Sequence, residues 1–150
     1  MSTRTLITTL MFAITIICLS LVLVPAHAFS LYLPTVDVDG SSVKIKNVYN
    51  VAGTGFTISG TLSAGEADLY GPLDLKIGDY VAISVKWTPP STTLAVILMN
   101  LLTGHAYITE SATGYILTTF YITESSPYWV LLVADYGPYA LTYQGVVVVS

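Results

Sequence analysis

Residues 58–87 read ISGTLSAGEADLYGPLDLKIGDYVAISVKW, which joins a glycine-punctuated turn region to the clearest alternating pattern in the chain. From Tyr80 onward, one face of that pattern collects the apolar side chains of Val81, Ile83, Val85 and Trp87. The other face collects Ala82, Ser84 and Lys86. A period of two predicts a β-strand with one side on a hydrophobic core. We therefore expect Trp87 to be buried as the last inward residue of this strand.

Further short apolar segments follow at close spacing, each bounded by turn residues. They predict strands at residues 93–99, 105–109, 115–122, 128–134 and 139–149. A shorter strand precedes them, in which Val43 and Ile45 alternate with Lys44 and Lys46, and its lysines suit a strand that guards a sheet edge. No amphipathic helix pattern occurs after the N-terminal segment. The sequence therefore predicts an all-β fold, a single jelly-roll-like antiparallel β-sandwich.

The order of glycines, acids and aromatics within this region matches a known pattern. The matching residues are Gly60, Leu62, Gly65, Glu66, Asp68, Tyr70, Leu75, Gly78, Asp79 and Val81, followed near the C-terminus by Tyr139, Leu141 and Tyr143. In this order the chain resembles the pre-peptidase C-terminal domain family over residues 58–149. The resemblance implies a small jelly-roll β-sandwich. Family members often carry aspartates after the tryptophan, whereas this chain has Ser91, Thr92 and Thr93 there, so it lacks the side chains of a calcium site at that place.

Residues 1–28 have the pattern of a secretory signal peptide. Arg4 precedes an apolar run from Leu6 to Val24, and Ala26-His27-Ala28 supplies the small residues that a signal peptidase reads. We expect cleavage before Phe29 and a secreted, cell-surface protein. A retained anchor is the alternative, because the apolar run approaches the length of about 20 residues that spans a bilayer. The membrane is a partner only in that case.

The chain after the signal divides into an extended N-terminal arm, residues 29–40, and a β-sandwich domain, residues 41–150. It contains four lysines and nine carboxylates, with no basic cluster and no cysteine. Such a charge balance does not suit nucleic acid. Without cysteine, no disulfide and no Cys-based zinc site can form.

Catalytic and metal-binding patterns are weak. His105 is the only histidine after the signal, and no G-x-S-x-G motif accompanies it, so a Ser-His-Asp hydrolase is not expected. Asp37 and Asp39 lead into Gly40 and Ser41, a segment that offers oxygen ligands for calcium but lacks the other acidic positions of an EF-hand. A plain turn is the favoured interpretation of that segment. We predict that the protein is not an enzyme and that it has no catalytic residues, no metal site and no cofactor.

Three runs break the alternation that a two-layer sandwich should keep. They are Leu94–Met99 (LAVILM), Tyr128–Ala134 (YWVLLVA) and Gly145–Val149 (GVVVV). Both faces of these strands are apolar, although one face of an antiparallel sandwich normally meets water. Something should therefore cover the second face, either another subunit or loops of the same chain.

Together these features predict a secreted structural subunit that assembles head to tail into an extracellular filament, thread or sheath. The arm would add a strand to a neighbouring subunit, with Leu31, Leu33, Val36 and Val38 as the assembly residues. The alternative hypothesis is a stand-alone secreted binding module for a polysaccharide or protein surface, in which tyrosines form the platform.

Overall fold

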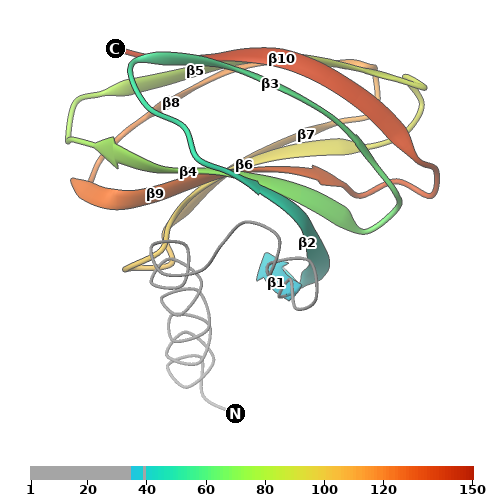
Figure 1. Ribbon diagram of the computed structural model, residues 1–150, viewed down its shortest axis with the longest axis horizontal. Helices are drawn as coiled ribbons and strands as arrows, with labels where there is room; N and C mark the ends of the chain where they lie inside the picture. Colours follow the sequence, from blue (N-terminus) through green and yellow to red (C-terminus); the bar gives the residue numbers. More distant parts are fainter. Residues whose placement is uncertain (1–34, 39) are drawn as a thin grey trace.

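The computed structural model describes residues 35–38 and 40–150, and this part of the chain is built from strands packed in layers (Figure 1). The predicted signal peptide, Leu31, Leu33 and Asp39 lie outside the described residues. No helix in the described part is long and apolar enough to cross a membrane. The strands are β1 (Thr35–Val38), β2 (Ser41–Tyr49), β3 (Gly55–Leu62), β4 (Glu66–Leu75), β5 (Tyr80–Thr88), β6 (Leu94–Asn100), β7 (Ala106–Ser111), β8 (Tyr115–Tyr121), β9 (Ser126–Asp135) and β10 (Leu141–Val149).

Two sheets form the sandwich that the alternation predicted. One has six strands in the order β1-β2-β4-β9-β6-β7, and the other has four strands in the order β3-β10-β5-β8. The prediction of an all-β sandwich is confirmed, with one correction. Strands β2 and β4 pair in parallel, whereas the other pairs are antiparallel. The parallel pair arises because the chain crosses from β2 to β3 in the other sheet before it returns as β4.

The main core lies between the two sheets. The inward side chains of β5 are at most 3% exposed, and they include Trp87 at the end of the strand, as predicted. The indole Nε1 of Trp87 donates a hydrogen bond of 2.7 Å to the Thr92 carbonyl oxygen. This hydrogen bond satisfies the one polar atom of the Trp87 side chain, as its burial requires.

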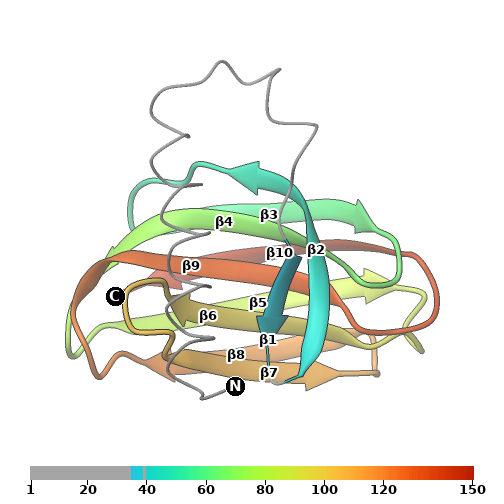
Figure 2. The ribbon, with the colours of Figure 1, turned by 90° about the horizontal axis from the view of Figure 1, so that it is seen from below.

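A second core lies on the outer face of the six-stranded sheet. There β1 and the first half of β2 run across β9 and β6 as a hairpin (Figure 2). Hairpin residues Val36, Val38, Val43 and Ile45 pack in one cluster with the outward side chains of β4, β6 and β9. This cluster explains two of the three double-faced runs, Leu94–Met99 and Tyr128–Ala134. Their second faces are covered by the chain's own hairpin, rather than by another subunit or by loops.

The hairpin also includes the described part of the predicted arm. β1 pairs with β2 from Thr35↔Lys44 to Val38↔Ser41, and Gly40 in the intervening turn has a φ of 78°, which favours glycine. The predicted assembly residues Val36 and Val38 are 3% and 4% exposed in this chain's own outer cluster. Asp37 faces solvent on β1.

Strand β2 is not an edge strand, since it lies between β1 and β4. Lys46 nevertheless protects an edge, that of β3 in the opposite sheet. Its Nζ donates a hydrogen bond of 2.7 Å to the Thr61 carbonyl oxygen and lies 3.4 Å from Glu66. The lysine therefore satisfies a carbonyl group on the free edge of β3, to which a strand of another chain could otherwise hydrogen-bond.

Candidate functional site on the four-stranded sheet

The outer face of the third double-faced run, Gly145–Val149, is not covered by any part of the chain that the structure describes. In β10 the side chain of Val147 is buried in the main core, while Val146 and Val148 are 48% and 46% exposed. They belong to the outer face of the four-stranded sheet, which we call the open face. Within residues 35–38 and 40–150, eleven large hydrophobic side chains are exposed, and six of them lie on the open face: Tyr80, Tyr115, Leu117, Tyr121, Val146 and Val148. The concentration on one face sets it apart as a surface for contacts with another molecule.

A row of polar side chains crosses the open face perpendicular to the strands. The register places Ser59 beside Gln144, Gln144 beside Lys86, and Lys86 beside Tyr115, one residue from each strand. We call these four residues the polar row. Together with Thr57, Ser84 and Val146, they line a shallow hollow of about 480 Å³. Since neighbouring strands lie about 4.8 Å apart, the row is about 14 Å long.

The open face has a distinct charge. Its outward positions carry no carboxylate, although residues 29–150 contain nine. Lys86 is its only ionised side chain and forms no ion pair with any described residue. The face therefore combines one free ammonium group with hydroxyl groups, an amide and the exposed aromatic rings of Tyr80, Tyr115 and Tyr121.

A buried hydrogen-bond network supports the polar row from below. Tyr143 Oη donates to Asp68 Oδ2 at 2.6 Å, and Asn47 Nδ2 donates to Asp68 Oδ1 at 2.8 Å. Since the single proton of Tyr143 goes to Asp68, Tyr70 must donate the 2.6 Å hydrogen bond to Tyr143 and accept from the Ser59 N–H at 3.3 Å. This network joins strands of both sheets. The network holds the backbone of Ser59 and the side chain of Tyr143, which precedes Gln144 in β10. It therefore fixes one end of the polar row.

Burial dominates the electrostatics of this network. It raises the pKa of the Asp68 carboxyl, against the opposing effect of the hydrogen bonds from Tyr143 and Asn47. Burial also raises the pKa of Tyr70 to about 12 and that of Tyr143 well above its ordinary value. Both hydroxyls therefore keep their protons at neutral pH and act as donors. Because Asp68 is fully buried, the network has a structural role and offers no surface to a ligand.

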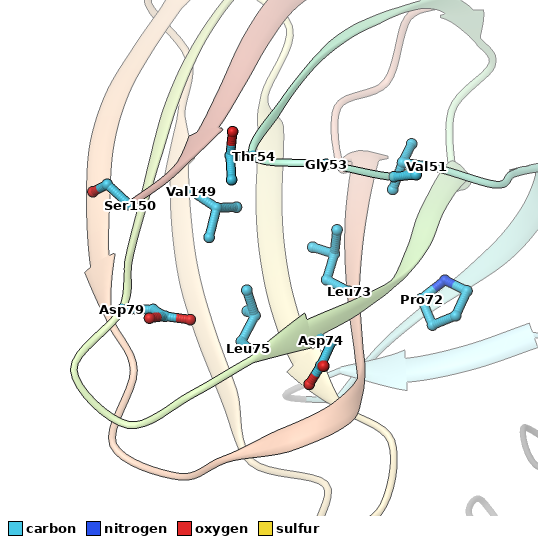
Figure 3. A pocket seen from close by; sticks show the side chains of 11 residues that line it. Val51, Gly53, Thr54, Pro72, Leu73, Asp74, Leu75, Asp79, Val149 and Ser150 are labelled. Atoms are coloured by element: carbon cyan, nitrogen blue, oxygen red, sulfur yellow. The ribbon is translucent and has the colours of Figure 1, made fainter.

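A cleft of about 410 Å³ opens at one end of the sandwich (Figure 3). Leu73, Leu75 and Val149 point into it. Its two carboxylates serve the adjacent turn, because Asp79 accepts a hydrogen bond from the Lys76 N–H at 2.8 Å and Asp74 lies 2.6 Å from Lys76 Nζ. The cleft therefore has apolar walls and carboxylates that are already engaged.

His105, the one histidine of the domain, lies in the loop before β7. Its Nδ1 is 3.4 Å from Glu124, whose carboxylate also accepts hydrogen bonds from Thr103 at 2.6 Å and Asn100 at 2.8 Å. The hydrogen bond from Thr103 is the largest cause that lowers the pKa of Glu124. This group links a loop to β6. Across the described residues, no three His, Cys, Asp or Glu side chains come together as a metal site would require.

Asp135, at the end of β9, is a buried carboxyl with one unsatisfied oxygen. The residue is 0% exposed, its Oδ1 accepts a hydrogen bond from the Gly137 N–H at 2.9 Å, and its Oδ2 has no hydrogen-bond partner. Burial raises the pKa of Asp135 to about 6, and the nearby charge of Glu66 adds to the effect. Burial therefore shifts this carboxyl toward its protonated form, which predominates below about pH 6.

Asp135→Asn should change how stability depends on pH. A raised pKa means that the folded protein binds more protons than the unfolded chain between about pH 4 and 6, so this group's contribution to the free energy of unfolding falls as pH rises. We expect the variant to gain about 2–3 kcal/mol relative to wild type between pH 4 and pH 7. Urea unfolding of both proteins at several pH values measures the difference. Parallel pH curves would contradict the expectation.

Sequence reasoning did not single out the residues of the polar row. Lys86 and Ser84 were placed correctly on the outward face of β5, and tyrosines were considered as a platform. Ser59, Gln144 and Tyr115 lacked any motif, because a row across a sheet depends on the register between strands that are distant in sequence. The double-faced run Gly145–Val149 was the one sequence signal that pointed to this face.

Comparison with known proteins supports the fold. No protein-family model matches the sequence, and no curated protein matches it significantly. Among solved structures, the pre-peptidase C-terminal domain of Bacillus anthracis collagenase is 17% identical, with a TM-score of 0.50, over 69% of this chain and 94% of that chain. PliG of Aeromonas hydrophila, a periplasmic inhibitor of g-type lysozyme, is 14% identical, with a TM-score of 0.50, over 71% of this chain and 98% of that chain. The β-sandwich is thus like that of a pre-peptidase C-terminal domain, as the motifs implied.

Proposed function

We propose that this chain is an exported binding module that recognises a macromolecule through the open face of its four-stranded sheet. The observation that carries the proposal is the contrast between the two outer faces. The chain covers one with its own β1–β2 hairpin and leaves six large hydrophobic side chains exposed on the other. Export is inferred from the signal pattern of residues 1–28. A fold shared with a periplasmic lysozyme inhibitor supports a role in binding outside the cytoplasm.

The structure offers little to the filament hypothesis. A donor strand needs an open sheet edge, but the free edge of β3 is occupied by Lys46 and by the hydroxyl of Tyr70. At the other side of the four-stranded sheet, β8 lies against β7, where Thr118 and Thr109 form a 3.2 Å hydrogen bond. Leu31 and Leu33 lie outside the described residues, so their role in assembly stays a prediction.

The open face also suits a macromolecule better than the end cleft does. The cleft's carboxylates already interact with residues of the 74–79 turn, whereas Lys86 and Gln144 on the open face make no ion pair or side-chain hydrogen bond with any described residue. Free polar groups beside exposed apolar ones give both orientation and affinity to a ligand.

Leu117→Glu tests the proposal, because Leu117 is 69% exposed on β8, the edge strand of the open face, beside Ser84. A charge placed there should weaken binding about 10-fold or more, by analogy with other interface anchors, without unfolding the domain. The measurement is binding of the purified domain to a defined panel of polysaccharides and extracellular proteins. Ile77→Glu is the matched control, since Ile77 is 65% exposed in the turn before β5, away from that face. Binding that survives Leu117→Glu and is lost in Ile77→Glu would overturn the proposal.

A further inference from the structure

The hollow on the open face has the side chains that a carbohydrate chain needs. Tyr115 presents a ring that is 48% exposed, on which the apolar face of a sugar can stack. Ser59, Ser84 and Gln144 line the same hollow and offer hydroxyl and amide groups for sugar hydroxyls. Among these, Ser84 Oγ lies 3.5 Å from Tyr115 Oη, at the long limit for a hydrogen bond.

The dimensions of the face suit a chain-like ligand rather than a globular protein. Four strands at about 4.8 Å spacing, each seven to nine residues and so about 23–30 Å long, give a face of roughly 500 Å². A stable protein–protein interface covers about 800 Å² on each partner. The hollow runs along the polar row, across all four strands, so an extended oligosaccharide can contact every residue of the row.

The charge of the face selects among carbohydrates. A protein with nine carboxylates and four lysines after its signal keeps every carboxylate off the outward positions of this face and places Lys86 in the middle of the hollow. Because no acidic side chain pairs with the Lys86 ammonium group, it can attract an anionic ligand without first losing an ion pair of its own. Lys86 lies between Gln144 and Tyr115 in the row, so a charged group bound there is flanked by a hydrogen-bonding group and a stacking ring.

We infer that the hollow binds a glycan chain that bears carboxylate groups, with one sugar stacked on Tyr115 and a carboxylate at Lys86 Nζ. The inference rests on the proposed function, because it uses the same face, and it adds the chemical class of the ligand. It requires Gln144 and Ser59 to contact the continuing chain.

The test compares three uronate-containing polysaccharides (polygalacturonate, alginate and hyaluronan) with neutral cellulose and with methyl-esterified polygalacturonate. We expect at least one uronate polymer to bind, and added salt or esterification to weaken its binding. Lys86→Gln should lower the affinity roughly 3- to 5-fold, as the loss of an exposed ion pair does. Tyr115→Ala should lower it roughly 3- to 10-fold. Lys76→Gln, a lysine on the turn that borders the end cleft, should leave it unchanged.

Two results would overturn the inference. One is binding of none of the three uronate polymers. The other is equal binding of neutral and acidic polymers together with no effect of Lys86→Gln. If Leu117→Glu still abolishes binding to a protein or a neutral polysaccharide, the proposed function stands and only the ligand class fails. If neither Leu117→Glu nor Lys86→Gln affects the binding of any ligand, both fail.

Discussion

Trp87→Ala should lower the free energy of unfolding by about 3–5 kcal/mol, the range for removing a buried aromatic side chain. Trp87 is 3% exposed in the core between the sheets. Its loss leaves a cavity between β5 and the facing sheet and removes the hydrogen-bond donor to the Thr92 carbonyl. For a domain of this size, the melting temperature should fall by roughly 10–20 °C.

Circular dichroism is the suitable probe for this variant, because fluorescence would change with the loss of the indole itself. Tyr139→Ala is the control: Tyr139 is also a large aromatic residue, but it is 63% exposed just before β10. We expect the control to change stability by less than about 0.5 kcal/mol. If the two variants unfold at the same denaturant concentration, Trp87 is not an anchor of the core.

The sequence was sufficient to predict this core because the information is local. Alternation along Tyr80–Trp87 places each side chain on one face of a strand, whatever the other strands do. The outer faces are a different matter. Leu94–Met99 and Gly145–Val149 look alike in sequence, yet the first is covered by the hairpin and the second is open. Strand order decides which run is covered, and strand order is set by contacts between distant segments.

The same reason explains why residues 35–38 were predicted as part of a free arm, although the structure places them in a hairpin. Val36 and Val38 alternate with polar residues, as a strand on any apolar surface would. The sequence does not say whether that surface belongs to the same chain or to a neighbour. In the structure the turn at Gly40 folds β1 back on β2, which brings both valines onto the chain's own outer cluster. Because the turn is short, forming the contact between β1 and β2 costs little loop-closure entropy.

Gly60→Ala should destabilise the domain by about 3 kcal/mol, because the position has no room for a methyl group. A Cβ at Gly60 would lie 2.5 Å from Asp68 Oδ2 and 3.0 Å from Cε1 of the Tyr143 ring. Neither group can withdraw freely. Asp68 is held by hydrogen bonds from Tyr143 and Asn47, and a shift that breaks one of them removes a bond to a buried carboxyl group, worth about 1.5–3 kcal/mol if it is ionised.

Gly55→Ala, in the same strand, is the matched control. A Cβ there would meet only the Val147 carbonyl oxygen, at an ordinary distance of 3.6 Å, so stability should hold or rise slightly. A double variant identifies the cause: in an Asp68→Ala background, Gly60→Ala should be less harmful, since the closest clash is gone. Urea unfolding of the four proteins measures this coupling. If the effects of Gly60→Ala and Asp68→Ala on stability are additive, the cost of Gly60→Ala comes from the strand itself and not from the clash with the Asp68 carboxylate. Coupling would instead explain why this glycine, Asp68 and Tyr143 occur together in the motif.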